Sequence, residues 1–418
     1  MYELTNFFSL FYSYVLEYLL VNSDRYGEKN MQTIKLYDDN AYETSFEATV
    51  ISCEKYEKKE NSYRLLLDKT LFFPEEGGQQ SDIGMIDDAK VCYVEIVKEV
   101  DEEKIYHIVD KDFKEGTVVS GKVDFTRRFD QMQQHSGEHI FSGLVHSKYG
   151  YNNVGFHLGE NIVTLDFDGM LTDSEVLEIE QMANEIISKN VAIKTYYPSE
   201  SELEKLDYRS KKKLEGPVRI VEIEGVDICA CCAPHVRMSG EITLLKVTSR
   251  INYKGGVRIS IECGKRALKT LFSTYEMMKG IAANLSTSME LVDASIKKQA
   301  DENQKLRAKL LSIKNKIIDE KINEIDVNKD FLYIDENLDM KFMQHIVNGA
   351  MEKTNMLCIA FSMDGDKCKF VIGSADEKAQ DAFSILKAKF KVKGGGSSKM
   401  VQGSIENVTK EDLENIKL

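Results

Sequence analysis

The sequence predicts an α+β protein that combines a small β-barrel, an α/β domain, a long helical, coiled-coil-like linker and a C-terminal α/β domain. Three patterns predict this arrangement. Short runs rich in β-branched and aromatic residues, separated by Gly and Asp turns, follow Met31. Helical and strand patterns then mix, as in an α+β layer. A polar helical stretch without glycine after Gly280 precedes a last segment of mixed character.

The elements divide the chain into five predicted parts. A length of 418 residues, at about 150 residues per domain, agrees with several domains. The parts are 1–30 (an N-terminal extension of unknown role), 31–125 (the barrel with a glycine loop), 126–264 (the α/β domain), 265–325 (the helical linker) and 326–418 (the C-terminal domain). The strands expected in them are 63–68, 91–97, 104–109, 218–224, 241–247, 331–334, 358–362 and 369–372, and the helices 131–149 and 173–190.

Composition excludes several classes of protein. Hydrophobic residues make up 42% and charged residues 30% of the chain, which is ordinary for a globular protein and excludes disorder, collagen and a polytopic membrane protein. The net charge of −14 excludes a chain-wide basic nucleic-acid wrapper, so any such contact needs local basic patches. Three of the 8 cysteines stand in Cys229-Ala230-Cys231-Cys232, which indicates a metal or thiol site in a reducing compartment. We therefore expect a cytoplasmic protein.

The apolar run from Phe7 to Val21 does not predict a membrane protein. It includes Glu17 and is shorter than the roughly 20 apolar residues that a spanning helix needs. No Lys or Arg precedes Arg25, whereas a secretory signal begins with basic residues. We expect an extension outside the main fold and no membrane partner, with an anchor or a partner-binding helix as the alternative.

The helical linker contains a heptad-like seam. Ser286 and Ser288 offer N-cap hydroxyls for a helix that starts after them. Steps of three and four residues then give seven apolar positions out of nine, with polar breaks at Gln299 and Asn303. The seam predicts a homodimer through 289–317, with a dimer through the C-terminal domain or a helix packed on its own chain as alternatives. Its positions are Met289, Val292, Ile296, Gln299, Asn303, Leu306, Leu310, Ile313 and Ile317.

Two short motifs predict a tetrahedral metal site. His135 and His139 lie four apart in a helical pattern, so both imidazoles share one helix face. Cys231 and His235 repeat the same step later in the chain. Three nitrogens and one thiolate suit Zn²⁺, with bond lengths of about 2.0 Å to nitrogen and 2.3 Å to sulfur. Satisfied core histidines are the alternative, and the neighbouring cysteines leave the identity of the thiolate open.

A glycine loop follows the strand at 63–68. Gly77 and Gly78 allow positive φ and close approach of the backbone to a ligand. Gln79 offers a donor and an acceptor, and Thr70 a hydroxyl, so both can pair with a small polar substrate. An ordinary turn is the alternative.

Taken together, these motifs resemble the editing domain of alanyl-tRNA synthetases and, more closely, the long form of the free-standing AlaX editing proteins. The resemblance rests on the run 68–79, the two metal motifs, Gly155-Phe156-His157-Leu158-Gly159 and Gly240-Glu241-Ile242. The tail 394–403 is similar to the glycine-rich signature of the DHH-associated domain that closes both families. It covers about 31–418, and one departure from the synthetase pattern is Cys232-Ala233-Pro234 in place of Gly-Gly-Thr.

The resemblance implies a zinc-dependent deacylase that hydrolyses mischarged Ser-tRNA(Ala), with Gly-tRNA(Ala) as a second substrate. It makes 126–264 the zinc-containing editing domain and 326–418 a tRNA-binding DHH-associated domain. The catalytic group would be the zinc or its water, and alanine-specific tRNA the partner. The implied zinc ligands are His135, His139, Cys231 and His235, and the residues beside the aminoacyl group are Thr70, Gly77, Gly78 and Gln79.

Two basic segments are candidates for tRNA contact. Residues 205–219 contain six Lys or Arg side chains against Asp207 and Glu215. The second segment has five lysines and no acid, beside three glycines, and such patches suit phosphate contact. The alternative is a solvated lysine face. The second set is Lys387, Lys389, Lys391, Lys393, Gly394, Gly395, Gly396 and Lys399.

The same motifs also fit two other functions. A zinc-structured tRNA-binding or coiled-coil scaffold without catalysis would share the ligands and the seam. A phosphodiesterase would need the acidic DHH cluster, which the sequence lacks. His157 is read as a hydrogen-bonded core histidine, with a general base or a tRNA contact as alternatives.

Overall fold

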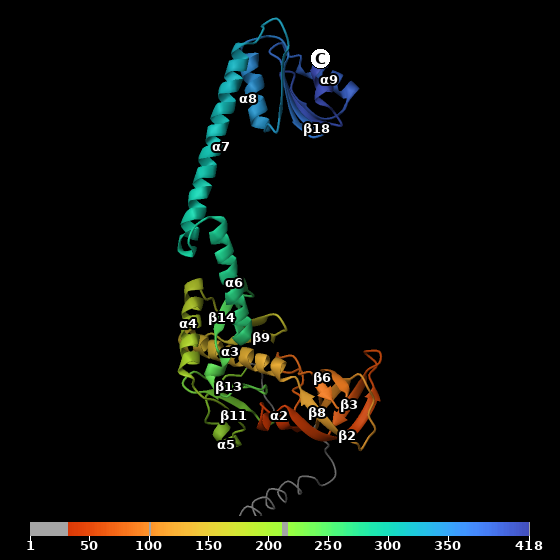
Figure 1. The fold of residues 1–418 in the computed structure, drawn as a ribbon, viewed down its shortest axis with the longest axis vertical. Coiled ribbons are helices and arrows are strands. Elements are labelled where there is room, and N and C mark those ends of the chain that lie inside the picture. Colours follow the sequence, from red (N-terminus) through yellow and green to blue (C-terminus); the bar gives the residue numbers. More distant parts are fainter. Residues whose placement is uncertain (1–31, 100–101, 211–215, 418) are drawn as a thin grey trace, which may run out of the picture. The chain divides into compact units, whose positions relative to one another are not determined.

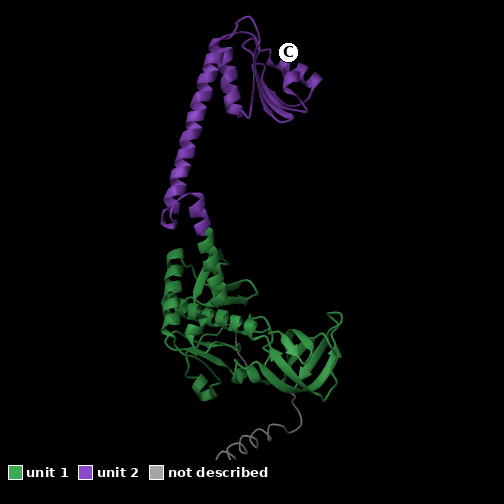
Figure 2. Cartoon of the chain, in the orientation of Figure 1, with its two compact units in different colours: residues 1–277 green, residues 278–418 purple. Residues whose placement is uncertain are grey.

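The computed structural model describes residues 32–99, 102–210 and 216–417 and groups the chain into two compact units, 1–277 and 278–418 (Figures 1 and 2). The mixture of helices and strands confirms the predicted α+β class. The finer division into five parts stays a prediction. Residues 1–30, with their apolar run, lie outside the described residues. In the part of the chain that the structure describes, no helix is long and apolar enough to span a membrane.

The first unit begins with a closed six-stranded barrel, as the sequence predicted. Alternating burial along Val118–Val123 shows why these residues form a strand, because every second side chain enters the barrel core. Leu65 and Ile105 fill that core and are fully buried. In barrel order the strands are β2 (Ser45–Lys55), β3 (Tyr63–Leu67), β7 (Glu102–Val109), β6 (Ala89–Glu99), β5 (Gly84–Ile86) and β8 (Val118–Val123), and β1 (Ile34–Lys35), α2 (Leu36–Asp39) and β4 (Lys69–Thr70) lie beside them.

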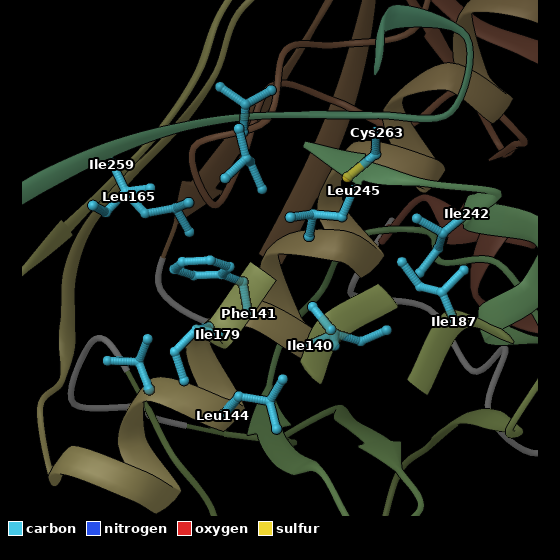
Figure 3. Close-up of a cluster of buried hydrophobic side chains, with 14 of the residues drawn as sticks. Ile140, Phe141, Leu144, Leu165, Ile179, Ile187, Ile242, Leu245, Ile259 and Cys263 are labelled. Carbon is cyan, nitrogen blue, oxygen red and sulfur yellow. The ribbon is translucent and has the colours of Figure 1, made fainter. Parts of the chain in front are cut away.

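The helix α3 (Phe125–Tyr149) follows the barrel and lies at the centre of the first unit (Figure 1). The Asp124 carboxylate caps it by accepting a hydrogen bond from the Arg127 backbone N–H at 3.2 Å. Ile140 and Phe141 point from α3 into the apolar core of this region (Figure 3). Because this core holds α3 on its apolar face, its polar face is fixed in position for the site described below.

The other elements of the first unit surround α3. Where the sequence predicted a strand at 241–247, its first part is instead a 3-10 turn (η1, Ser239–Ile242), since Glu241 caps that turn by accepting from the Met238 backbone N–H. One sheet contains β14 (Leu245–Tyr253), β15 (Gly256–Cys263), β10 (Val163–Phe167) and β9 (Asn153–Leu158), in that order. The rest are α4 (Asp173–Lys189), α5 (Glu200–Leu203) and the sheet of β11 (Ile193–Tyr196), β12 (Ile220–Ile223) and β13 (Asp227–Ala230).

A buried ion pair joins α3 to the barrel. The Arg128 guanidinium donates to the Asp82 carboxylate, with Nε 2.9 Å from Oδ1, and also to the Leu71 carbonyl at 2.6 Å. Arg128 and Asp82 are both fully buried. Removing one partner of such a pair leaves an uncompensated charge, so this contact fixes the first turns of α3 against the glycine loop that follows Leu71.

The second unit contains a long helix and an α/β sandwich. Helix α7 (Val292–Asn323) packs against α8 (Met340–Met351) through Ile318 and Ile322, which are buried. A five-stranded sheet follows in the order β16 (Phe331–Glu336), β17 (Cys358–Asp364), β18 (Lys367–Gly373), β20 (Met400–Glu406) and β19 (Lys391–Gly396). The remaining elements are α9 (Ala379–Lys389), α10 (Lys410–Glu414) and η2 (Met289–Leu291), and α6 (Gly264–Asn284) crosses the boundary between the units.

Candidate metal centre

Four buried or half-buried side chains converge in the first unit. His135 and His139 come from one face of α3, and Cys231 and His235 from the segment after β13. Their ligand atoms all lie within 4.8 Å of one another. The Cys231 Sγ is 3.5 Å from the Nε2 of both His135 and His235. A tetrahedral Zn²⁺ with bonds of about 2.0 and 2.3 Å sets sulfur and nitrogen about 3.5 Å apart, so the residues fit this ion.

The second nitrogen of each imidazole has its own partner. The Nδ1 of His135 is 2.7 Å from Oε1 of Gln79, which is fully buried. The Nδ1 of His235 is 3.0 Å from the Ser136 hydroxyl, which also accepts the Val236 backbone N–H. Partners on Nδ1 set the ring orientation and leave Nε2 for a metal. Gln79 was predicted as a substrate contact, and here its side-chain oxygen orients a cluster residue.

His139 is held by a carboxylate. Its Nδ1 is 3.1 Å from Oδ2 of Asp227, and the Arg209 guanidinium donates to both oxygens of Asp227, at 2.7 and 2.8 Å. The contact between His139 and Asp227 requires the chain at Val226 to approach α3 closely. A Cβ on Gly143, one turn after His139, would lie 2.7 Å from the Val226 carbonyl oxygen. The small residue therefore lets the Asp227 turn reach the helix.

The charges of the cluster favour a bound cation. Burial alone would raise the pKa of the Cys231 thiol, but the surrounding imidazoles outweigh it and hold this pKa well below its ordinary value. Burial lowers the pKa of His235 to about 3. Burial would also lower the pKa of His139, but Cys229 and Asp227 outweigh it and raise that pKa. Surroundings that stabilise a positive charge on His139 also stabilise a metal ion at the same place. The lowered pKa of Cys231 provides the thiolate that such an ion binds.

A further carboxylate faces the cluster. Glu138 is fully buried, and its Oε1 accepts hydrogen bonds from the Ser142 hydroxyl at 2.7 Å and from Nδ2 of Asn153 at 2.6 Å. Its Oε2 is 3.8 Å from Nε2 of His139 and 4.0 Å from Nε2 of His135. Glu138 therefore directs one oxygen toward the point where the ligand atoms meet. No spacing pattern in the sequence marks Glu138 as part of the cluster.

The glycine loop reaches the cluster through strand β9. Gly77 and Gly78 have φ values of 65° and 85°, and a Cβ on Gly78 would lie 2.5 Å from the Phe156 carbonyl oxygen. The Gly78 carbonyl accepts the Leu158 backbone N–H at 2.7 Å. The ring of Phe156 also lies 4.7 Å from that of His135, centroid to centroid. The two glycines thus bring Gln79 beside the cluster, a role that a side chain at either position would obstruct.

Comparison with known proteins finds similarity over the barrel and over the segment that carries Cys231 and His235. Two family models match, "tRNA synthetases class II (A)" on residues 21–127 and "Threonyl and Alanyl tRNA synthetase second additional domain" on residues 218–260. "Alanyl-tRNA editing protein Aarsd1-A" of Xenopus laevis is 31% identical over 265 residues, 60% of this chain and 63% of that protein. "Alanyl-tRNA editing protein Aarsd1" of Danio rerio is 26% identical over 389 residues, 89% of this chain and 93% of that protein. Over most of its length the chain is similar to alanyl-tRNA editing proteins and to alanine–tRNA ligases.

The "Alanine--tRNA ligase" of Ignicoccus hospitalis is 26% identical over 380 residues, which are 87% of this chain and 40% of the ligase. The chain therefore spans less than two thirds of the length of the Ignicoccus and Xenopus relatives. The second family model includes the half of the cluster that carries Cys231 and His235.

Two residues that the sequence analysis assigned to the site, or to the core, lie in other surroundings. Thr70 is fully buried, and its hydroxyl lies 2.8 Å from Nε2 of His107 and accepts the Phe72 backbone N–H at 3.0 Å. Its hydrogen-bonding capacity is thus used inside the barrel, which corrects the expectation that it reads a substrate hydroxyl together with Gln79. His157 is exposed on β9, so its interpretation as a core histidine was wrong.

The two basic segments predicted to contact tRNA differ in how far their side chains reach the solvent. In the first, Arg209 binds Asp227, and the buried Arg219 donates to the carbonyls of Cys231 and Ala233 at 3.1 and 2.8 Å. Both stabilise the cluster segment, so the expectation that they contact tRNA was wrong. Lys211, Lys212 and Lys213 lie outside the described residues.

The second segment stays at the surface of the second unit. Lys391 and Lys393 both pair with Glu406, and Lys399 pairs with Glu377 at 3.7 Å. Lys387 lies 4.3 Å over the Phe383 ring, and Lys389 is exposed at the end of α9. Gly394, Gly395 and Gly396 form the end of the edge strand β19. The segment therefore has exposed lysines next to three glycines, whose backbone no side chain covers from its own strand.

Proposed function

We propose that the chain is a zinc-dependent aminoacyl-tRNA deacylase that removes serine from Ser-tRNA(Ala) in trans, with Gly-tRNA(Ala) as a second substrate. The observation that supports this most strongly is the arrangement of the three imidazoles. Each has a partner on Nδ1, and each directs Nε2 toward the others and toward Cys231. This arrangement is expected of metal ligands. Histidines that only pack in a core do not need to direct three Nε2 atoms toward one point.

His135, His139, Cys231 and His235 would hold the ion. Bound zinc would supply Lewis acidity for the carbonyl of the ester that joins serine to the tRNA. Asp227 and Gln79 keep His139 and His135 in the ring orientations that direct Nε2 inward. Glu138 is our candidate to accept the proton of the attacking water, because a proton acceptor must lie within reach of the reacting group and Oε2 faces the ligand atoms.

The need for such an enzyme follows from the limits of size discrimination. A pocket built for alanine rejects a substrate that differs by one small group only about 10- to 200-fold. A second site whose buried polar groups require a hydroxyl can do better, since leaving them unpaired is costly. Gln79 supports this role: its Oε1 is used by His135, while its Nε2 is buried without a hydrogen-bond partner among the described residues. A substrate oxygen near Gly77 and Gly78 would satisfy that donor.

We further propose that the second unit binds the tRNA. Residues 326–418 would act as the DHH-associated domain, with Lys387, Lys389, Lys391, Lys393 and Lys399 contacting phosphates beside Gly394, Gly395 and Gly396. The exposure of these lysines supports the proposal. The ion pairs of Lys391 and Lys393 with Glu406 reduce their charge, so their contribution should be smaller than a count of lysines suggests.

The test is incubation of the zinc-loaded protein with labelled Ser-tRNA(Ala), Gly-tRNA(Ala) and Ala-tRNA(Ala). We expect release of serine with alanine spared, and slower release of glycine, which lacks the hydroxyl. Release of no amino acid, while tRNA still binds, would favour a zinc-structured tRNA-binding scaffold, a function that a shell already filled by four protein ligands would also suit. Equal release of all three would contradict a selective pocket.

A further inference from the structure

A row of polar side chains on α3 leads from the surface to the candidate metal centre. Arg127, Gln131 and His135 stand four residues apart, so they follow one side of the helix. Arg127 is half-buried, whereas Gln131 and His135 are 1% and 2% exposed. At about 1.5 Å per residue, the row is about 12 Å long. It therefore begins with a cation that reaches the solvent and ends at a member of the cluster.

The glycine loop contacts this row along its length. Nη2 of Arg127 donates to Oε1 of Gln80 at 3.0 Å, and Nε2 of Gln131 donates to the Gln80 carbonyl at 3.2 Å. The next residue of the loop toward the glycines, Gln79, has its Oε1 2.7 Å from Nδ1 of His135. The loop and the row thus run side by side up to the cluster.

Three polar atoms along this contact lack a hydrogen-bond partner among the described residues. They are Nε of Arg127, Oε1 of Gln131 and Nε2 of Gln79, and each atom is buried. Buried polar atoms in proteins are nearly always paired, so a group of unpaired ones beside a candidate active site indicates a ligand. The ligand would have to supply acceptors for Arg127 and Gln79 and a donor for Gln131.

The charge of Arg127 has no carboxylate partner. In the described part of the first unit, most arginines pair with Asp or Glu, and Arg127 and Arg237 are the exceptions. The guanidinium of Arg127 has instead the neutral oxygen of Gln80. The paired arginines are Arg64, Arg128, Arg209, Arg219, Arg250, Arg258 and Arg266.

The acids nearest to Arg127 on the chain are engaged elsewhere. Asp124 accepts the Arg127 backbone N–H as the helix cap, and Asp130 pairs with Arg266 at 2.6 Å. A half-buried guanidinium whose charge is not balanced attracts an anion. Its planar fork of N–H donors matches the oxygens of a phosphate.

We propose that Arg127 and Gln131 form a subsite for the sugar–phosphate of the nucleotide that carries the amino acid. This proposal rests on the proposed function, which places the aminoacyl ester at the cluster. Arg127 binds the 5′-phosphate of the 3′-terminal adenosine, in place of the neutral Gln80 oxygen. Gln131 accepts a hydrogen bond from the ribose hydroxyl next to the ester, a group that distinguishes RNA from DNA.

The subsite gives the substrate a contact away from the bond that breaks. The phosphate and the ester lie on opposite sides of one ribose, and the row from Arg127 to His135 extends over a comparable length. Binding energy from such a remote contact can hold the ester in position at the reacting centre. The contact belongs to the first unit alone and is separate from the lysines of residues 387–399.

The first test measures binding of two analogues to the zinc-loaded full chain by calorimetry. They are 3′-serylamino-3′-deoxyadenosine with and without a 5′-phosphate, in which an amide replaces the ester. The wild type should prefer the phosphorylated form about ten- to thirtyfold, because a charge-assisted hydrogen bond is formed only with the phosphate. Arg127→Ala should reduce this preference to within about threefold. Arg237→Ala, which removes the other arginine without a carboxylate partner, is the matched control and should keep the wild-type preference.

Equal affinities for the two analogues in the wild type, binding of neither, or a preference that survives Arg127→Ala would overturn the proposal. These measurements need no hydrolysis, so the two proposals can fail separately. A phosphate preference that depends on Arg127, in a chain that releases no serine from Ser-tRNA(Ala), would leave the subsite and remove the deacylase. Serine release without this preference would do the reverse.

The second test concerns the ribose hydroxyl. Removing the 2′-hydroxyl from the phosphorylated analogue should weaken binding to the wild type about two- to tenfold, the effect of one hydrogen bond. In Gln131→Leu, the two forms should bind within about twofold of each other. Gln133→Leu is the control, because Gln133 is a buried glutamine of the same helix that donates to the Glu241 carbonyl. An equal loss in the wild type and in Gln131→Leu would overturn the role of Gln131.

Discussion

The imidazole–thiolate cluster and the lysine segment of residues 387–399 hold their charges in opposite ways. The cluster side chains are buried or half-buried, and each imidazole is fixed by a partner on Nδ1. The side chains of Lys391 and Lys393 are 71% and 74% exposed and share one carboxylate, Glu406. A buried network depends strongly on each member and little on salt, whereas exposed cations act additively and are screened. The first arrangement suits chemistry, and the second suits affinity for a polyanion.

The largest expected effect is the loss of a ligand. His139→Ala should abolish zinc binding and lower the rate of serine release by more than about 100-fold, because the imidazole is replaced by a cavity and Asp227 loses its partner. Zinc content by elemental analysis and serine release are measured together. Cys231→Ala should behave in the same way. Cys232→Ala is the control and should keep the metal, and the assignment of Cys231 is wrong if Cys232→Ala loses it.

A large loss of rate with the metal retained is expected at Glu138. Glu138→Gln keeps the size of the side chain but removes a proton acceptor, so kcat for serine release should fall by roughly 10²- to 10⁴-fold. Zinc content should stay at the wild-type level. An unchanged kcat would show that Glu138 only completes the hydrogen bonds of Ser142 and Asn153.

A smaller effect is expected from the partner of His139. Asp227→Asn weakens the hydrogen bond on Nδ1, and changes of this kind lower metal affinity about 10- to 100-fold. Competition with a chelator measures the affinity. Asp166→Asn is a matched control, because Asp166 also pairs with an arginine, Arg258, on a different sheet of the same unit. Equal loss in both variants would point to a general loss of stability.

The lysine segment should respond to salt and not to metal. Changing Lys387, Lys389, Lys391 and Lys393 to Ala should reduce the slope of log affinity for tRNA against log salt by roughly 2 to 3, less than four full charges because Glu406 neutralises part of them. Zinc content and kcat should not change. Lys410→Ala, an exposed lysine of α10 in the same unit, is the control. A slope that does not change would make these lysines a solvated face.

The smallest effect on activity is expected at Thr70. Thr70→Val removes the hydrogen bond to His107 inside the barrel, which should lower the free energy of unfolding by about 1 to 3 kcal/mol because a buried nitrogen is left unpaired. The ratio of serine to glycine release should stay within about twofold of the wild type. Denaturant unfolding and paired deacylation assays measure the two effects. A selective loss on Ser-tRNA(Ala) would restore Thr70 as the residue that reads the hydroxyl.

The sequence predicted the parts of the cluster that depend on local spacing. His135 and His139 share a helix face because they are four residues apart, and Cys231 and His235 repeat that step. The partners of the imidazoles could not be predicted, since His139 and Asp227 are 88 residues apart and meet only through tertiary packing. The closed barrel and α3 followed from strand patterning and helical periodicity.

Two errors have the same origin. Thr70 lies near the glycine loop in the chain, but its side chain enters the barrel and meets His107, which is 37 residues away. The lysine-rich sequence around Arg209 and Arg219 predicts surface cations. In the structure both side chains turn inward and stabilise the cluster segment. Composition predicts the charge of a segment, while the fold decides which members of it reach the solvent.

Serine release should depend on one zinc ion held by the cluster, and metal titration tests this dependence most directly. Chelator-treated protein should release no serine from Ser-tRNA(Ala) while it keeps its far-ultraviolet circular dichroism and binds tRNA. Adding zinc should restore the rate in proportion to metal bound, with a plateau at about one ion per chain. Full activity in the metal-free chain, or a plateau reached without zinc bound at His139 and Cys231, would contradict this dependence on zinc.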